Sequence, residues 1–209
     1  MKSLSPINLT NGLSVAALIL SSASASAQTV TLPTSVGNAG QIITVVKSDA
    51  SANTVSILTT SSQTIDGLTA TRRLFYQNDL MSFQSDGANW HIIEWRINGA
   101  VPLTDAATIA VDCSLIPPGG AAKVILAGNR TLGAFTNYVK GQRFALYVRQ
   151  DATGSRTLAY TATGAGCQRF SSDFPSPTLT TTGSKTDKIQ WFHDEDANTF
   201  DCVGIVRGF

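Results

Sequence analysis

Two histidines, His91 and His193, are the first residues to consider for catalysis in this chain. Neither belongs to a sequence pattern that would supply a catalytic partner such as an aspartate or a cysteine. His91 follows Trp90 in an expected strand, and His193 opens a turn. The sequence contains no zinc-protease, serine-hydrolase, phosphate-loop or dinucleotide-binding motif. We therefore expect a protein that is not an enzyme and that uses no cofactor.

Metal binding is also not expected. Asp194, Glu195 and Asp196 could offer oxygen ligands to calcium, but this acidic run lacks the glycine and the distant bidentate acid of an EF-hand loop, so a solvated acidic turn is favoured. Three cysteines are present, at Cys113, Cys167 and Cys202. They form no closely spaced pair that would suggest zinc. Three buried thiols are favoured, and one disulfide with a free thiol stays open.

Aromatic and basic side chains are the remaining candidates for binding. Trp95, Trp191 and Tyr147 could stack on sugar rings, although a tryptophan on a strand of a small β-domain usually belongs to a core or an interface. Arg72 and Arg73 could face an acidic partner, but a solvated face is the favoured interpretation.

The composition indicates how such residues would be positioned. Of the 209 residues, 43% are apolar and 14% are charged, with 15 basic against 14 acidic residues. This balance excludes a disordered chain and leaves no electrostatic footprint for nucleic acid. Many threonines and small residues favour strands and turns. A β-rich chain with so little charge should need partners for its exposed edges.

One pattern occurs twice along the chain. Alternating apolar residues at 43–45 and at 55–57 flank the polar segment 47–53, and the same arrangement recurs around segment 149–155. We predict a β-hairpin at each place. Each copy closes with a second predicted hairpin whose last strand opens on an aromatic residue, Trp90 or Phe200, which we expect to plug a small core.

The N-terminal residues have two interpretations. Lys2, the apolar run at 13–20 and the small residues at 25–27 resemble a secretory signal peptide, although the basic region holds a single lysine. The run is too short to span a bilayer. We favour an anchoring arm over residues 1–32. Its apolar residues would pack on a partner: Leu13, Val15, Leu18, Ile19 and Leu20.

These elements predict a mainly β protein of two small tandem domains, each an antiparallel β-sandwich or barrel-like unit, preceded by the extended arm. An Asn-Gly pair and a proline at 98–102 mark the boundary between domains at 33–99 and 100–209.

Several motifs resemble modules of tailed-bacteriophage structural proteins. In the first copy these are residues 39–45 (AGQIITV), 47–55 (KSDASANTV), 63–67 (QTIDG) and 85–90 (SDGANW). In the second copy they are residues 105–112 (DAATIAVD), 126–132 (LAGNRTL), 141–144 (GQRF), 149–158 (RQDATGSRTL) and the C-terminal segment 191–209.

The resemblance implies a non-enzymatic virion protein, often a homotrimer, that contacts the major capsid protein or portal and tail components. Within this class we favour a capsid decoration or head-fibre protein anchored by its arm. One alternative is a tail-fibre or baseplate adhesin that binds a host surface glycan. Another is a secreted bacterial β-protein with a cleaved leader. No nucleic acid or membrane partner is expected.

Overall fold

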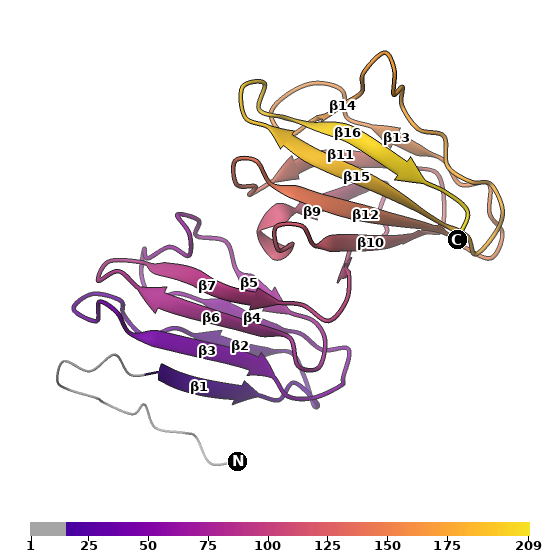
Figure 1. The fold of residues 1–209 in the computed structure, drawn as a ribbon. Helices are drawn as coiled ribbons and strands as arrows, with labels where there is room; N and C mark the ends of the chain where they lie inside the picture. Colours follow the sequence, from indigo (N-terminus) through magenta and orange to yellow (C-terminus); the bar gives the residue numbers. More distant parts are fainter. Residues whose placement is uncertain (1–15) are drawn as a thin grey trace.

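The computed structural model describes residues 16–209, whose regular elements are β-strands apart from one 3₁₀ turn, so the mainly β prediction is confirmed (Figure 1). The first half contains β1 (Ala16–Ser21), β2 (Gln28–Thr31), β3 (Ile42–Lys47), β4 (Val55–Leu58), β5 (Arg72–Leu74), β6 (Leu80–Ser85) and β7 (Trp90–Arg96). The second half contains β8 (Val101–Pro102), β9 (Thr108–Asp112), the 3₁₀ turn η1 (Cys113–Leu115), β10 (Ala121–Leu126), β11 (Arg130–Thr136), β12 (Arg143–Gln150), β13 (Leu158–Tyr160), β14 (Gln168–Arg169), β15 (Thr186–Asp194) and β16 (Thr199–Val206).

The first half winds as a coil between two sheets. β1 and β3 are parallel neighbours in the sheet ordered β1-β3-β6-β7, and β2 and β4 are parallel neighbours in the sheet ordered β2-β4-β5. Each turn of the coil therefore adds one strand to both sheets, as in a β-solenoid. β5 pairs antiparallel with β4 and completes one sheet. β6 pairs antiparallel with β3 and with β7, and these strands complete the other sheet.

The second half repeats this winding with one additional turn. β8, β10 and β12 are parallel neighbours in the sheet ordered β14-β16-β15-β12-β10-β8, which we call the six-stranded sheet. β9, β11 and β13 are parallel neighbours in the opposite sheet. β15 and β16 close the unit as an antiparallel pair, just as β6 and β7 do in the first half.

The prediction of antiparallel sandwiches or barrels is therefore wrong, because the early strands of each half are parallel turns of a coil. The polar segments 47–53 and 149–155 are corners rather than hairpin turns, since β3 and β4, like β12 and β13, belong to different sheets. A chain that crosses between sheets about 10 Å apart needs a polar segment like that of a long hairpin loop. The two closing hairpins are confirmed, and Trp90 and Phe200 are both fully buried.

Each half has its own hydrophobic core. The first core is filled from both sheets, by side chains such as Val45 of β3 and Ile57 of β4. The second is larger and rich in aromatic residues, where Phe135 makes edge-to-face contacts with Phe144 and Phe200. Such ring pairs add to the stabilisation from apolar burial.

The expected arm over residues 1–32 is wrong for the part that the structure describes. Residues 16–32 contribute β1 and β2 to the first half, and Ala17, Ile19 and Val30 pack on its core beside the buried Leu32. The alternation in this segment places every second side chain on the core face, as in any half-buried strand. Leu13 and Val15 lie outside the described residues.

Candidate functional site

The coil begins with a turn that is open to a partner. β1 and β2 are each the last strand of their sheet, so within residues 16–209 each pairs along one edge only. We call this pair of strands the open turn. Leu18 and Leu20 point away from the core and are 63% and 64% exposed, whereas Ile19 packs on the core. An unpaired strand edge beside exposed leucines can accept another chain.

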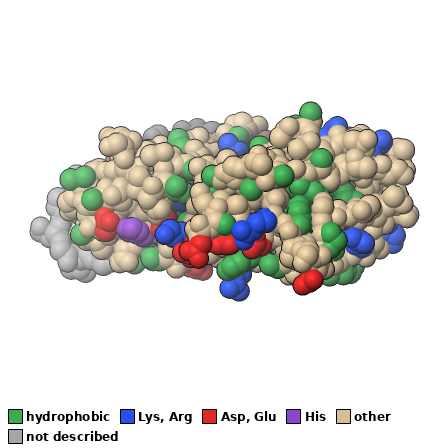
Figure 2. All heavy atoms as spheres, turned by 90° about the horizontal axis from the view of Figure 1, so that it is seen from above, with side chains coloured by type: hydrophobic (Ala, Val, Ile, Leu, Met, Phe, Trp, Pro, Cys, Tyr) green, Lys and Arg blue, Asp and Glu red, His purple; other side chains and the backbone are tan. Residues whose placement is uncertain are grey.

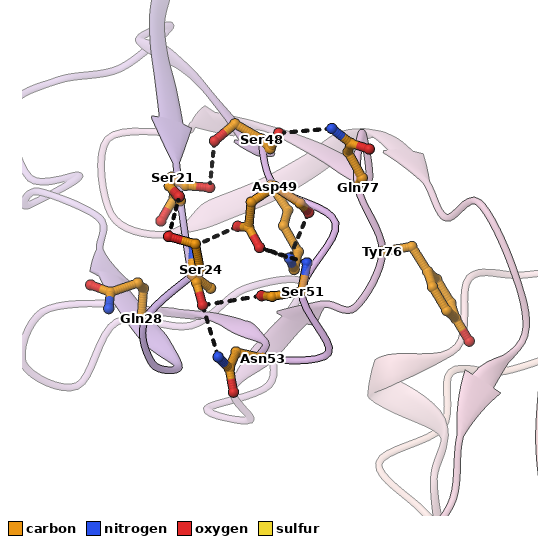
Figure 3. Close-up of polar contacts among 12 residues, drawn as sticks. Ser21, Ser24, Gln28, Ser48, Asp49, Ser51, Asn53, Tyr76 and Gln77 are labelled. Atoms are coloured by element: carbon orange, nitrogen blue, oxygen red, sulfur yellow. Dashed lines mark hydrogen bonds and ion pairs between the residues drawn. The ribbon is translucent and has the colours of Figure 1, made fainter.

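A corner centred on Asp49 holds the open turn in place (Figure 3). The Asp49 carboxylate accepts hydrogen bonds from the backbone N–H of Ala23 at 2.5 Å and of Ser51 at 2.9 Å. It also binds the ammonium of Lys47 at 2.8 Å, although Lys47 is fully buried. The carbonyl oxygen of Ala23 accepts from Ser51 Oγ and Asn53 Nδ2. The first and second turns of the coil are thus joined through polar side chains.

The two halves have equivalent corners with similar electrostatics. Hydrogen bonds from Lys47 and Ser51 favour the ionised carboxylate, so the pKa of Asp49 lies well below its ordinary value of 3.8. In the second half, Asp151 binds Arg156 at 2.8 Å and the backbone N–H of Gly154 at 2.9 Å. The Arg156 hydrogen bond is the main cause that lowers the pKa of Asp151.

Arg72 connects the halves rather than facing solvent, so its interpretation as part of a solvated face is wrong. Its side chain is 2% exposed and donates to the carbonyl oxygens of Ser114 at 2.8 Å and Ile65 at 3.0 Å. Tyr76 adds a second link, from its hydroxyl to the carbonyl oxygen of Ala100. A buried arginine is tolerated when carbonyl groups replace its water. The exposed neighbour, Arg73, remains available to a partner.

The outer face of the six-stranded sheet gathers cations beside aromatic rings. The ammonium of Lys188 lies 5.3 Å from the ring centroid of Tyr147, and the guanidinium of Arg143 lies 4.6 Å from that of Phe192. A shallow trough of about 440 Å³ lies on this face beside Arg143 and Phe192, and Ala145, Gln190 and Val203 also line it. We call this surface the cationic face. Sequence analysis missed it, although the signal exists as basic and aromatic residues at alternate positions of the strands.

The three candidates for sugar stacking do not form one platform. Trp95 lines a groove of about 420 Å³ at the junction of the halves, and Arg72 lies 5.9 Å from its ring. Trp191 is 1% exposed in the second core and has no face to offer. Tyr147 lies on the cationic face. Of the three, Trp191 is therefore excluded as a stacking residue in this structure.

The residues first considered for catalysis and metal binding have structural contacts. His91 interacts with the carboxylate of Asp86 at 2.9 Å on an exposed turn, while His193 is 2% exposed and lies beside Tyr138. Asp194 accepts from backbone N–H groups of its own turn and binds Arg169. Across residues 16–209, no three or more histidine, cysteine or acidic side chains are grouped to hold a metal ion.

All three cysteines are buried and unpaired, as predicted. Burial raises the pKa of Cys202 to about 11 and raises that of Cys113 further. Both thiols are therefore uncharged at neutral pH.

Comparisons with known proteins add no relative: no family model, curated protein or solved structure matches the chain. Within the described residues, no helix has the length and apolarity needed to cross a membrane. The two candidate binding surfaces, the open turn and the cationic face, are therefore identified from the structure alone.

Proposed function

We propose that this protein is a non-enzymatic structural component of a tailed-bacteriophage virion, most simply a capsid decoration or head-fibre protein. The observation that carries the proposal is the open turn, where two strand edges and the exposed Leu18 and Leu20 lie at the start of the coil. A neighbouring subunit that adds a strand there would satisfy backbone groups and cover both leucines.

The rest of the molecule is consistent with such a role. Two small β modules in series give an elongated molecule (Figure 1). Its surface seen from above is mostly uncharged, with acidic and basic side chains gathered along its middle (Figure 2). Apolar burial contributes roughly 25 cal/mol per Å², and a stable interface covers about 800 Å² on each partner. The contact must therefore extend beyond two leucines, and the edges of β1 and β2 supply that additional surface.

Particle association tests this proposal. Phage particles are purified from cells that express either the wild-type chain or the double variant Leu18→Ser, Leu20→Ser, and are labelled with an antibody to the protein. We expect label on the head for the wild type and loss of label for the double variant. Val36→Ser is the matched control, because Val36 is also 63% exposed but lies in a loop.

Label on the tail would replace the decoration role with the tail-fibre or baseplate alternative. Particles that lack the wild-type protein altogether would overturn the virion proposal.

A further inference from the structure

We propose that the cationic face binds an acidic polysaccharide, which lies in the trough over β12, β15 and β16. This inference goes beyond the virion proposal and does not depend on where the protein sits in a particle. It would give the protein a direct contact with a charged surface glycan. The argument rests on the floor of the trough, on its walls and on the charges along them.

Ala145 and Gln190 form the floor of the trough, and the exposed Val203 also lines it. The two floor residues belong to a line of small or flexible side chains across the sheet. The strand registers place Ala121 opposite Ala145, Ala145 opposite Gln190, and Gln190 opposite Gly204. A Cβ added at Gly204 would lie 3.5 Å from Gln190 Oε1, so Gly204 leaves open space beside this lining residue. Neighbouring strands are about 4.8 Å apart, and the line therefore extends about 14 Å across the sheet. A short oligosaccharide can lie along it.

Cations border both sides of this floor. On one side Lys123, Tyr147 and Lys188 are in register on three adjacent strands, and on the other Arg143 is opposite Phe192. Each cation lies near an aromatic ring: Lys123 is 5.4 Å from Tyr76, and Lys188 is also 4.3 Å from Phe209. These contacts restrict the long side chains before a ligand arrives, which reduces the entropy lost on binding.

The positive charge is not neutralised within the face. Lys123, Arg143 and Lys188 form no ion pair with a carboxylate anywhere in residues 16–209. The carboxylates of Asp194 and Asp201 lie on the same face, with Asp201 opposite Phe192, and both bind Arg169. The face thus carries three cations without a carboxylate partner, and this surface complements a polyanion.

A carboxylated sugar chain fits this surface better than nucleic acid does. Single-stranded nucleic acid binds through bases stacked on open aromatic rings. Here Tyr147 and Phe192 already contact Lys188 and Arg143. Sugar hydroxyls can instead exchange hydrogen bonds with the exposed amide of Gln190, which both donates and accepts.

Binding of defined oligosaccharides to the full-length protein tests the inference. Calorimetric titrations would use an oligogalacturonate hexamer as the acidic probe, maltohexaose as the neutral one and an oligothymidylate as the nucleic-acid probe. We expect oligogalacturonate to bind, more weakly at higher salt, and the other two to bind much less. The double variant Arg143→Gln, Lys188→Gln should weaken oligogalacturonate binding about tenfold.

Two further variants separate charge, shape and folding. Gly204→Leu places a bulky side chain beside Gln190 at the edge of the trough without changing charge, and it should also reduce binding, with circular dichroism confirming the fold. Arg73→Gln with Arg96→Gln removes two exposed cations from the first half and should leave binding unchanged. The inference is overturned if oligogalacturonate does not bind, if the face variants bind it as the wild type does, or if maltohexaose or oligothymidylate binds equally well.

Discussion

Asp49 shows how one side chain can set the course of the coil. Its carboxylate closes its own corner through Ser51, and it also holds Ala23 on the preceding turn and neutralises the buried Lys47. The three contacts require an ionised carboxylate, which explains its depressed pKa. A substitution here therefore affects both the corner and the open turn.

Asp49→Asn should lower the Tm at neutral pH by several degrees, because it leaves Lys47 without its counter-ion. The folded-state pKa of Asp49 is depressed, so the stability that its charge contributes is complete above the ordinary value of 3.8 and is lost as the pH falls below it. The difference in Tm between variant and wild type should therefore narrow below about pH 4. Thermal unfolding across this range measures it, with the exposed Asp173→Asn as control. A constant difference at all pH values would contradict the assignment.

The side chain of Arg72 joins the two halves of the molecule. Arg72→Ala leaves the carbonyl oxygens of Ser114 and Ile65 buried without their donor. We expect a loss of about 3 kcal/mol in the free energy of unfolding. Arg73→Ala, on the exposed neighbour, should change it by less than about 0.5 kcal/mol. Urea denaturation of the two variants makes the comparison, and equal effects would show that Arg72 does not support the junction.

The sequence indicated part of this residue-level structure. A corner aspartate that bonds its own turn was predictable from the motif. Its contact with Ala23 was not, because that contact depends on how the coil brings distant residues together. For Arg72, two adjacent arginines look alike in sequence, and only strand alternation decides which one is buried.

At the scale of elements, the apolar run at residues 13–20 is the clearest case in which the sequence does not determine the type of element. A short apolar run is compatible with a leader, with an arm or with a strand, and periodicity alone does not separate them. The structure places residues 16–21 in β1, with parallel pairing to β3 along its full length. A hairpin and a corner cannot be distinguished from sequence for a similar reason. In both, a polar segment joins two strands with alternating apolar and polar side chains. The closing hairpins were predictable because their turns are short and acidic.

A chain that begins at Gln28 tests the contribution of β1. This truncation keeps β2 whole but removes the strand that pairs with β3 and the buried Ala23. We expect lower thermal stability and aggregation through the uncovered edge of β3. A chain that begins at Ala16 retains every described strand and serves as the control. Equal melting and equal solubility of the two truncations would show that β1 is dispensable to the fold.

The whole molecule is a pair of similar coils that differ by one turn and end in antiparallel hairpins. Antiparallel strands follow the parallel turns in both sheets of the first half and in the six-stranded sheet, whereas β1 and β2 have no strand beyond them among residues 16–209. This asymmetry gives the molecule one end suited to growth or attachment. Low overall charge favours association, since little electrostatic repulsion opposes contact between copies.

Self-association through the open turn is the prediction at this scale. We expect copies of the full chain to associate, because the exposed Leu18 and Leu20 gain burial when copies meet. The resemblance to phage modules implies a homotrimer, with a mass three times that of the 22.0 kDa chain. Light scattering coupled to size-exclusion chromatography should show that Leu18→Ser with Leu20→Ser shifts the protein toward monomer, while Val36→Ser does not. A wild-type monomer at every concentration would contradict self-association through the open turn.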